Sequence, residues 1–138
     1  MTIIGILLNI VGFFALLEGC MGVTSPQTTK SLLRYLLDNL SVRAIRALMF
    51  VSGFVFGLIS IGVATNIPPD SSILDYILIL VSSVLGIFYI ILAISLPVDF
   101  KESELVERLL NVPSAQFRLY EAGTLFFGIL CVFVSIRY

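Results

Sequence analysis

Long uncharged apolar stretches constrain the fold of this chain more than any other feature of its sequence. Three of them occupy residues 1–17, 47–69 and 76–98. Each is close to the roughly 20 residues that a helix needs to cross the hydrocarbon core of a bilayer. A fourth, residues 122–136, spans the membrane if the chain enters near Phe117, with the long side chains of Arg118 and Glu121 at the level of the lipid headgroups.

The composition and patterning favour a membrane protein made of helices. Only 12% of the residues are charged, whereas a soluble domain carries about a quarter. Membrane-spanning strands would alternate in polarity over about ten residues, but these stretches are apolar on every face. We therefore expect an all-α integral membrane protein with four transmembrane helices, at about residues 3–23, 46–67, 74–97 and 117–136. The first stretch lacks the basic segment and cleavage site of a secretory signal, so we expect it to remain on the mature chain.

The lysine and arginine residues predict the orientation in the membrane, because positively charged residues of short loops stay on the cytoplasmic side. Seven of the eight fall between the first and second spans or between the third and fourth: Lys30, Arg34, Arg43, Arg46, Lys101, Arg108 and Arg118. Arg137 alone falls on the other side. We therefore expect a multi-pass protein of the cell (plasma or inner) membrane with both termini outside.

The chain also contains an approximate internal repeat. A shift of 71 residues places Pro26 on Pro97 and Gly57 on Gly128, and the apolar stretches coincide. Both halves have the order span, proline, amphipathic segment, basic span start, span. We predict two membrane hairpin units, 1–67 and 68–138, formed by duplication. Because each unit has two spans, the two units have the same orientation, unlike the inverted repeats of many carriers.

A short amphipathic segment follows the proline in each half. In the first half Ser25 is a candidate cap for a helix that begins at Pro26, and leucines recur along one face at helical spacing. We predict interfacial helices at about residues 26–40 and 100–111, each with its apolar face in the acyl boundary. The alternative is that these helices fold back on the bundle.

Short motifs in both halves follow one pattern. The first half has Leu17-Glu18-Gly19, Pro26, Asn39-Leu40, Arg46, Gly53 and Gly57, and the second has Pro97, Asn111-Val112-Pro113, Arg118, Gly123 and Gly128. This pattern resembles an uncharacterised family of small two-helix bacterial inner-membrane proteins, a domain of unknown function. Glu18 has no acidic counterpart in the second half, and Pro113 has no counterpart in the first. The resemblance implies a membrane hairpin doubled into one chain, and it implies no activity.

The residue types needed for catalysis are scarce. The chain has no histidine, the commonest general base and metal ligand, and no glycine-rich phosphate loop. At about 1.5 Å per residue, Cys20 and Cys131 are expected about 20 Å apart in depth, which is too far for a disulfide, so both are predicted to be buried structural thiols. We expect neither an enzyme nor a bound cofactor or metal.

Glu18 is the one acidic residue that follows an entire apolar span. An intramembrane acid is a functional candidate because its ionised form is costly in hydrocarbon. One hypothesis is that Glu18 couples protons. We favour an intramembrane ion pair of Glu18 with Arg46 or Arg118, which lie at a similar predicted depth and would hold the two units together.

Pairs of small residues predict close helix contacts. Gly53 and Gly57 are four residues apart in the second span, and Ser82 and Gly86 form a similar pair in the third. Because no hydrophobic effect drives helices together in lipid, small residues stabilise a helix pair by letting the backbones approach. We expect all four residues at helix contacts.

These features together predict a protein that works through contacts. We expect a non-catalytic accessory or structural subunit of a larger membrane protein complex, for example a respiratory or metal-dependent oxidoreductase assembly. Its expected partners are the lipid bilayer and other integral membrane subunits, with no nucleic acid, and a homo-oligomer remains open. The alternative function is a small oligomeric transporter or channel that uses Glu18 as its coupling acid.

Overall fold

Six α-helices make up the part of the chain that the computed structural model describes, residues 2–97 and 104–138. They are α1 (Ile3–Thr24), α2 (Pro26–Asn39), α3 (Val42–Thr65), α4 (Ile73–Ser95), α5 (Glu104–Leu110) and α6 (Ser114–Ser135). No strand occurs within these residues. The helices α1, α3, α4 and α6 are long and apolar enough to cross a membrane. This confirms the predicted all-α membrane fold, with each span within a few residues of its expected position.

Local capping explains where these helices begin. The side-chain oxygens of Thr2 and Ser41 each accept a hydrogen bond of 3.1 Å from the backbone N–H three residues ahead, which satisfies one of the donors left free at a helix start. Pro26 is the first residue of α2, as predicted. Ser25 precedes it but makes no capping bond through its side chain, so the proline and not the serine cap defines this helix start.

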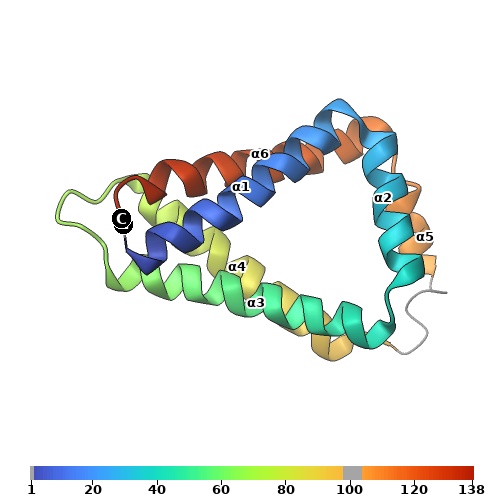
Figure 1. Ribbon diagram of the computed structural model, residues 1–138, viewed down its shortest axis with the longest axis horizontal. Helices are drawn as coiled ribbons and strands as arrows, with labels where there is room; N and C mark the ends of the chain where they lie inside the picture. The colour runs from blue at the N-terminus through green and yellow to red at the C-terminus, as the bar shows by residue number, and fades with distance from the viewer. Residues whose placement is uncertain (1, 98–103) are drawn as a thin grey trace.

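The transmembrane helices pack in two pairs that are not successive in the sequence. α1 packs along α6 and α3 packs along α4, whereas α1 makes few contacts with α3 and α4 makes few with α6. Figure 1 shows the two pairs converging beside the C terminus and diverging toward α2 and α5, so that the chain outlines a triangle. We name the converging side the closed end and the side of α2 and α5 the open end.

The two predicted units are therefore not self-packed hairpins. Within residues 1–67, α2 crosses the open end and separates the start of α3 from the end of α1 (Figure 1). Each unit instead packs its first span on the last span of the other unit. This pairing is therefore symmetric between the two halves. The shift of 71 residues places Ile3, the start of α1, on Leu74, and Val42, the start of α3, on Pro113. Leu74 and Pro113 lie one residue from the starts of α4 and α6.

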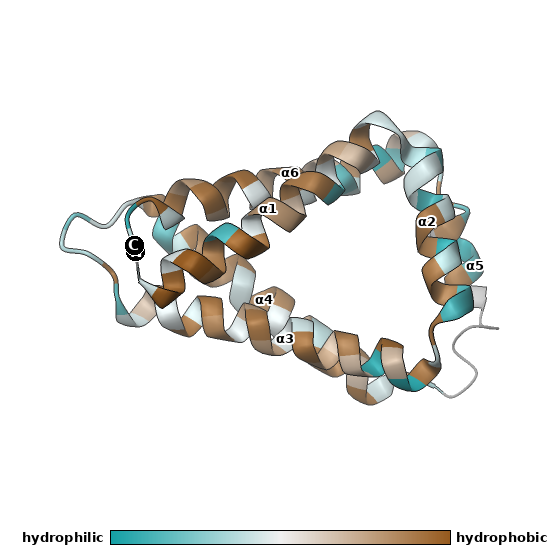
Figure 2. Cartoon of the chain, in the orientation of Figure 1, coloured by the Kyte–Doolittle hydropathy of each residue, from teal (hydrophilic) through white to brown (hydrophobic). Residues whose placement is uncertain are grey.

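The hydrophobic core lies toward the closed end, where the four spans meet. Its buried members come from all four transmembrane helices: Leu8, Ile59, Val63, Leu78, Phe127, Leu130, Cys131 and Val134. Large apolar side chains, such as those of Phe13, Phe54 and Leu80, also cover the outer faces of the spans. Figure 2 shows this apolar character along all four helices. Such outward apolar faces are those of a multi-pass protein surrounded by lipid.

The short helices α2 and α5 both lie at the open end (Figure 1). The side chain of Lys30 donates a hydrogen bond to the Val112 carbonyl and lies 5.3 Å from the centre of the Phe117 ring. Arg34 and Glu107 form an exposed ion pair at 4.0 Å. These contacts tie the polar side of α2 to the second half of the chain. Residues 100–103 of the second predicted interfacial helix lie outside the described residues.

Candidate functional site

A cleft of about 610 Å³ separates the α1/α6 pair from the α3/α4 pair. Valine, leucine and phenylalanine side chains from all four spans form most of its walls. Its polar members are Glu18, Ser52, Tyr89, Tyr120 and Thr124. The cleft lies on the open-end side of the core, so it is the place where the four spans begin to separate.

The cleft exists because small residues hold helices together within each pair and seldom between pairs. A Cβ atom added to Gly19 of α1 would lie 2.6 Å from the backbone nitrogen of Leu125 of α6. Gly12 and Gly128 form another close approach of the same two backbones. Between the pairs, Gly62 of α3 meets a side chain of α1 near the closed end. The spans therefore pack closely within each pair and less closely between the pairs.

The second pair contains the predicted helix-contact residues. A Cβ atom on Gly53 would lie 3.1 Å from the carbonyl oxygen of Gly86, and one on Gly86 would lie 3.2 Å from that of Gly53. Ser82 is fully buried on α4, and its hydroxyl has no hydrogen-bond partner in the described part of the chain. Gly57 takes part through its backbone, because a Cβ atom on Gly86 would lie 3.3 Å from the Gly57 nitrogen, whereas a Cβ atom on Gly57 itself would meet nothing within 4 Å. All four residues thus lie in or beside the α3/α4 contact, but the side-chain face of Gly57 is open.

The sequence analysis missed the glycine seam of α1. The buried residues of this helix are Gly5, Leu8, Gly12, Gly19 and Gly22, and Ala15 fits the same alternation of three and four residues. This spacing is that of the inner positions of a coiled coil. It would have indicated one contact face on the first span, although it does not indicate which helix packs there.

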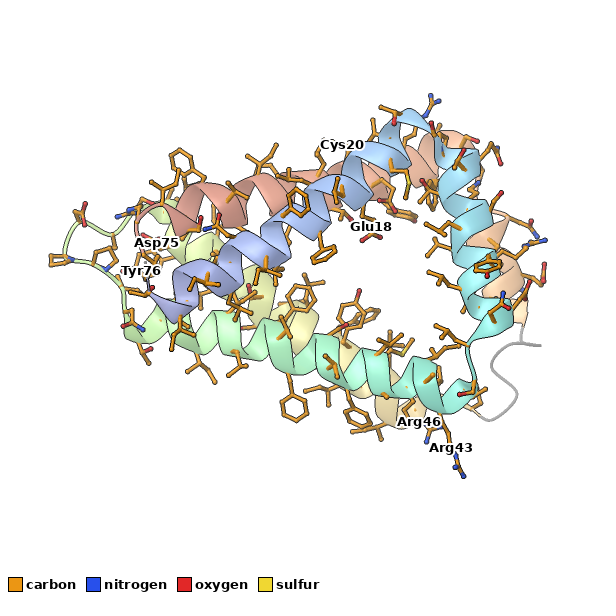
Figure 3. All side chains as sticks on the ribbon, viewed as in Figure 1. Glu18, Cys20, Arg43, Arg46, Asp75 and Tyr76 are labelled. Atoms are coloured by element: carbon orange, nitrogen blue, oxygen red, sulfur yellow. The ribbon has the colours of Figure 1, made fainter. Side chains whose placement is uncertain are left out.

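Glu18 points into the opening between α1 and α3 (Figure 3) and lines the cleft. As a whole residue Glu18 is exposed, and its carboxylate lies near enough to Tyr89 and Glu121 for electrostatic interaction. Cys20, two residues on, lies on the opposite side of α1 in Figure 3. Cys20 is exposed and not buried as expected, and both cysteines are free thiols.

The structure does not bring Glu18 together with either predicted arginine. No ion pair joins Glu18 to Arg46 or Arg118 in the described residues, which include all three. The Nη2 of Arg46 donates instead to the carbonyl oxygen of Leu96 at 2.5 Å, and the side chain projects away from the cleft (Figure 3). The physical reason is the divergence of the helix pairs: similar depth in the membrane does not give lateral proximity where α1 and α3 separate.

A second carboxylate lies on the seam beside Glu18. Glu121 of α6 packs against Gly22 of α1, one helical turn beyond Glu18. Its side chain is 6% exposed, and its Oε2 is buried with no hydrogen-bond partner in residues 2–97 and 104–138. Glu18 thus lines the cleft while Glu121 is buried in the α1/α6 contact, and no ion pair in the described structure neutralises either of them.

The charged groups of the closed end are paired. The Nη1 of Arg137 lies 2.8 Å from the Oδ2 of Asp75, whose side chain is fully buried. The same carboxylate oxygen accepts from the backbone N–H of Ser72 at 2.8 Å and so caps α4. Arg137 also donates to the Asp70 carbonyl oxygen at 2.8 Å. This ion pair, which the sequence analysis did not predict, fastens the end of α6 to the start of α4.

Other polar contacts complete the closed end. The backbone N–H of Thr2 donates to the carbonyl oxygen of Tyr138 at 2.9 Å, and the hydroxyl of Ser135 donates to Asn9 at 3.0 Å. Burial raises the pKa of the Tyr138 hydroxyl, and the nearby Asp75 raises it further. The hydroxyl therefore keeps its proton and donates to the Val63 carbonyl at 3.4 Å. These bonds link both helix pairs at one end.

The described residues contain no group of three or more histidine, cysteine, aspartate or glutamate side chains that could hold a metal ion. What the cleft offers is an apolar groove with an acidic edge. No protein-family model, curated protein or solved structure matches this chain. The candidate site must therefore be interpreted from its own geometry and charge.

Proposed function

We propose that this chain is a non-catalytic accessory subunit of a larger membrane protein complex, and that the cleft receives a transmembrane helix of another subunit. The helix that fits carries a lysine or arginine at the depth of Glu18. The chain itself supplies a scaffold, formed by two glycine-packed helix pairs fastened at the closed end. Its partner completes the open end.

The position of Glu18 in the cleft, with no basic partner among the described residues, is the observation that carries this proposal. Glu18 lies six residues before the end of α1, which is about 9 Å along the helix at 1.5 Å per residue. An ionised carboxylate at that depth is costly unless a cation neutralises it. No arginine or lysine of the described chain does so. A basic side chain from a partner supplies the missing charge.

The polar residues of the cleft favour a helix over lipid tails as the occupant. Ser52 lies on the α3 wall, and Thr124 and Tyr120 lie on the α6 wall. Hydroxyl groups of this kind form hydrogen bonds across helix contacts in membranes, whereas acyl chains have no groups to bond with them. The rest of the cleft is apolar and suits the remaining side chains of a membrane helix.

The basic residues support the proposed orientation. The open end carries most of the described basic residues, and the closed end carries Arg137. Those of the open end include Lys30, Arg34, Arg43, Arg46 and Arg118. By the positive-inside rule the open end is cytoplasmic and both termini are outside. A cysteine introduced at Ser71 should react with a membrane-impermeant maleimide in intact cells. Reaction only after the membrane is opened would reverse the orientation. The first span of each half packs on the last span of the other half, and this symmetric pairing supports the proposed origin by duplication.

The accessory role is tested by native purification and mass spectrometry of the integral membrane proteins that co-purify. Glu18→Gln removes the charge but keeps the shape, and Cys20→Ser is the matched control on the opposite side of α1. The proposal expects one membrane protein to co-purify in fixed ratio with the unaltered chain and with Cys20→Ser, and to be largely lost with Glu18→Gln. Equal recovery of the partner with all three chains would contradict the proposal that the partner docks in the cleft.

Transport by the chain alone is the outcome that would replace this proposal. If purified protein in vesicles moves protons or a solute without any partner, and Glu18→Gln abolishes the movement, then Glu18 acts as a coupling acid. The accessory function expects no such movement from either chain.

A further inference from the structure

A second groove, of about 450 Å³, lies on the outer side of α3 at the open end, away from the cleft. Its lining consists of Val42, Arg43, Arg46, Ala47 and Phe50. Figure 3 shows the side chains of Arg43 and Arg46 projecting from the same side of the helix. Two guanidinium groups thus border an apolar groove at the start of a transmembrane helix.

The positive charge of this groove is not neutralised by the described residues. Arg43 is exposed, and neither arginine forms an ion pair with any of them. The two side chains are three residues apart on a helix, so their like charges repel. They also lie near the positive end of the α3 macrodipole, and the first turn of α3 contains no acidic residue. Each of these terms favours an anion in the groove.

Arg46 is fixed in place but only partly satisfied. Its Nη2 donates to the carbonyl oxygen of Leu96 near the end of α4, while its Nε is buried with no hydrogen-bond partner among the described residues. Of the other described cations of the open end, Arg34 pairs with Glu107, and Lys30 donates to the Val112 carbonyl and lies over the Phe117 ring. The Arg43 and Arg46 pair is distinguished by the apolar groove that it borders.

We infer that this groove binds an acidic phospholipid of the surrounding leaflet. The phosphate lies between Arg43 and Arg46, and an acyl chain follows Val42, Ala47 and Phe50 along α3. Arginine suits this role because its planar group donates two parallel hydrogen bonds to phosphate oxygens. The location also fits a lipid, since the groove opens outward at the level where an apolar span begins. The inference is independent of the partner proposed for the cleft.

Lipid binding to the full-length protein in detergent can be counted by native mass spectrometry. The protein is titrated with phosphatidylglycerol and with phosphatidylcholine of the same acyl composition. We expect one phosphatidylglycerol to bind preferentially. At the affinity expected per cation near an acidic surface, Arg43→Ala with Arg46→Ala should weaken that binding about thirtyfold. Equal binding of the two lipids by the unaltered chain would overturn the inference.

Two further variants separate the groove from general electrostatics. Arg34→Ala with Arg118→Ala removes the same charge from the open end and should leave phosphatidylglycerol binding unchanged; a loss equal to that of the groove variant would overturn the assignment. Arg43→Ala alone leaves the Arg46 bond to Leu96 intact, so it tests the groove even if the double variant fails to fold, and it should weaken binding about fivefold. Inorganic phosphate at millimolar concentration should not displace the lipid. If it does, the groove is a site for a free anion and not for a lipid.

Discussion

The two ends of this membrane protein differ in how their buried and cleft-lining charges are compensated, although an exposed ion pair of Arg34 with Glu107 also occurs at the open end. At the closed end the buried carboxylate of Asp75 lies 2.8 Å from Arg137 and also caps α4. At the open end Glu18, Glu121, Arg43 and Arg46 form no ion pair with one another. The same four spans that meet tightly at one end diverge toward the other (Figure 1).

The closed end is the part of the molecule that is stable without a partner. Hydrogen bonds and an ion pair between elements define the closed end, together with the apolar core. At the open end, α2 and α5 connect the two helix pairs. Few direct contacts join the spans of one pair to those of the other. Unpaired charges facing a cleft and a groove are costly in the chain alone, and partners at the open end would relieve that cost.

The largest expected effect comes from breaking the closed end. Arg137→Met leaves the carboxylate of Asp75 buried without a counter-charge, and such a loss typically costs about 3–5 kcal/mol. The free energy of unfolding, measured by denaturant titration in mixed micelles, should fall by about that amount. Adding Asp75→Leu should restore part of the loss, because the isolated charge is then removed. If the double variant loses as much free energy of unfolding as the two single variants lose together, this assignment is contradicted.

The next largest effect contrasts two glycines in the α1/α6 pair. Gly19→Ala places a methyl group against the backbone of Leu125 and should cost about 1–3 kcal/mol of overpacking. Gly123→Ala is the matched control, since a Cβ atom there meets nothing within 4 Å. The control should leave stability unchanged or slightly higher, because alanine is the better helix former. Equal losses at both positions would show that the α1 seam is not the contact.

A smaller effect is expected within the α3/α4 pair. The hydroxyls of Ser60 and Ser83 lie 2.5 Å apart, and hydrogen bonds between membrane helices contribute about 0.6 kcal/mol on average. Ser60→Ala should therefore lower the free energy of unfolding by about that amount. A loss as large as that of Arg137→Met would show that this pair, and not the closed end, holds the fold together.

The smallest effect on stability is expected at the open end. Glu18→Gln breaks no ion pair of the described chain, so the free energy of unfolding should stay within about 0.5 kcal/mol. The same change should weaken association with the partner. A large destabilisation of the isolated chain would instead place Glu18 in the scaffold, with Asp75, and would remove the contrast between the ends.

Local features of this fold could be predicted from the sequence, and lateral ones could not. Helix length and apolarity are set by neighbouring residues, so the four spans and the start of α2 at Pro26 were predictable. The packing of α1 on α6 was not, because these spans are apolar on every face and hydropathy does not mark a contact side. The proposed pairing of Glu18 with Arg46 failed for the same reason: the sequence gives depth, while proximity depends on which helices pack together.

Two adjacent phenylalanines distinguish a cleft that receives another membrane helix from a cleft that lipid fills. Phe14 lines the cleft and Phe13 does not, although both are exposed. A photo-crosslinking amino acid placed at either position can be activated in native membranes, and the adducts identified by mass spectrometry. We expect position 14 to crosslink to a transmembrane segment of another protein bearing lysine or arginine, and position 13 to label lipid. Lipid adducts alone from both positions would contradict this expectation.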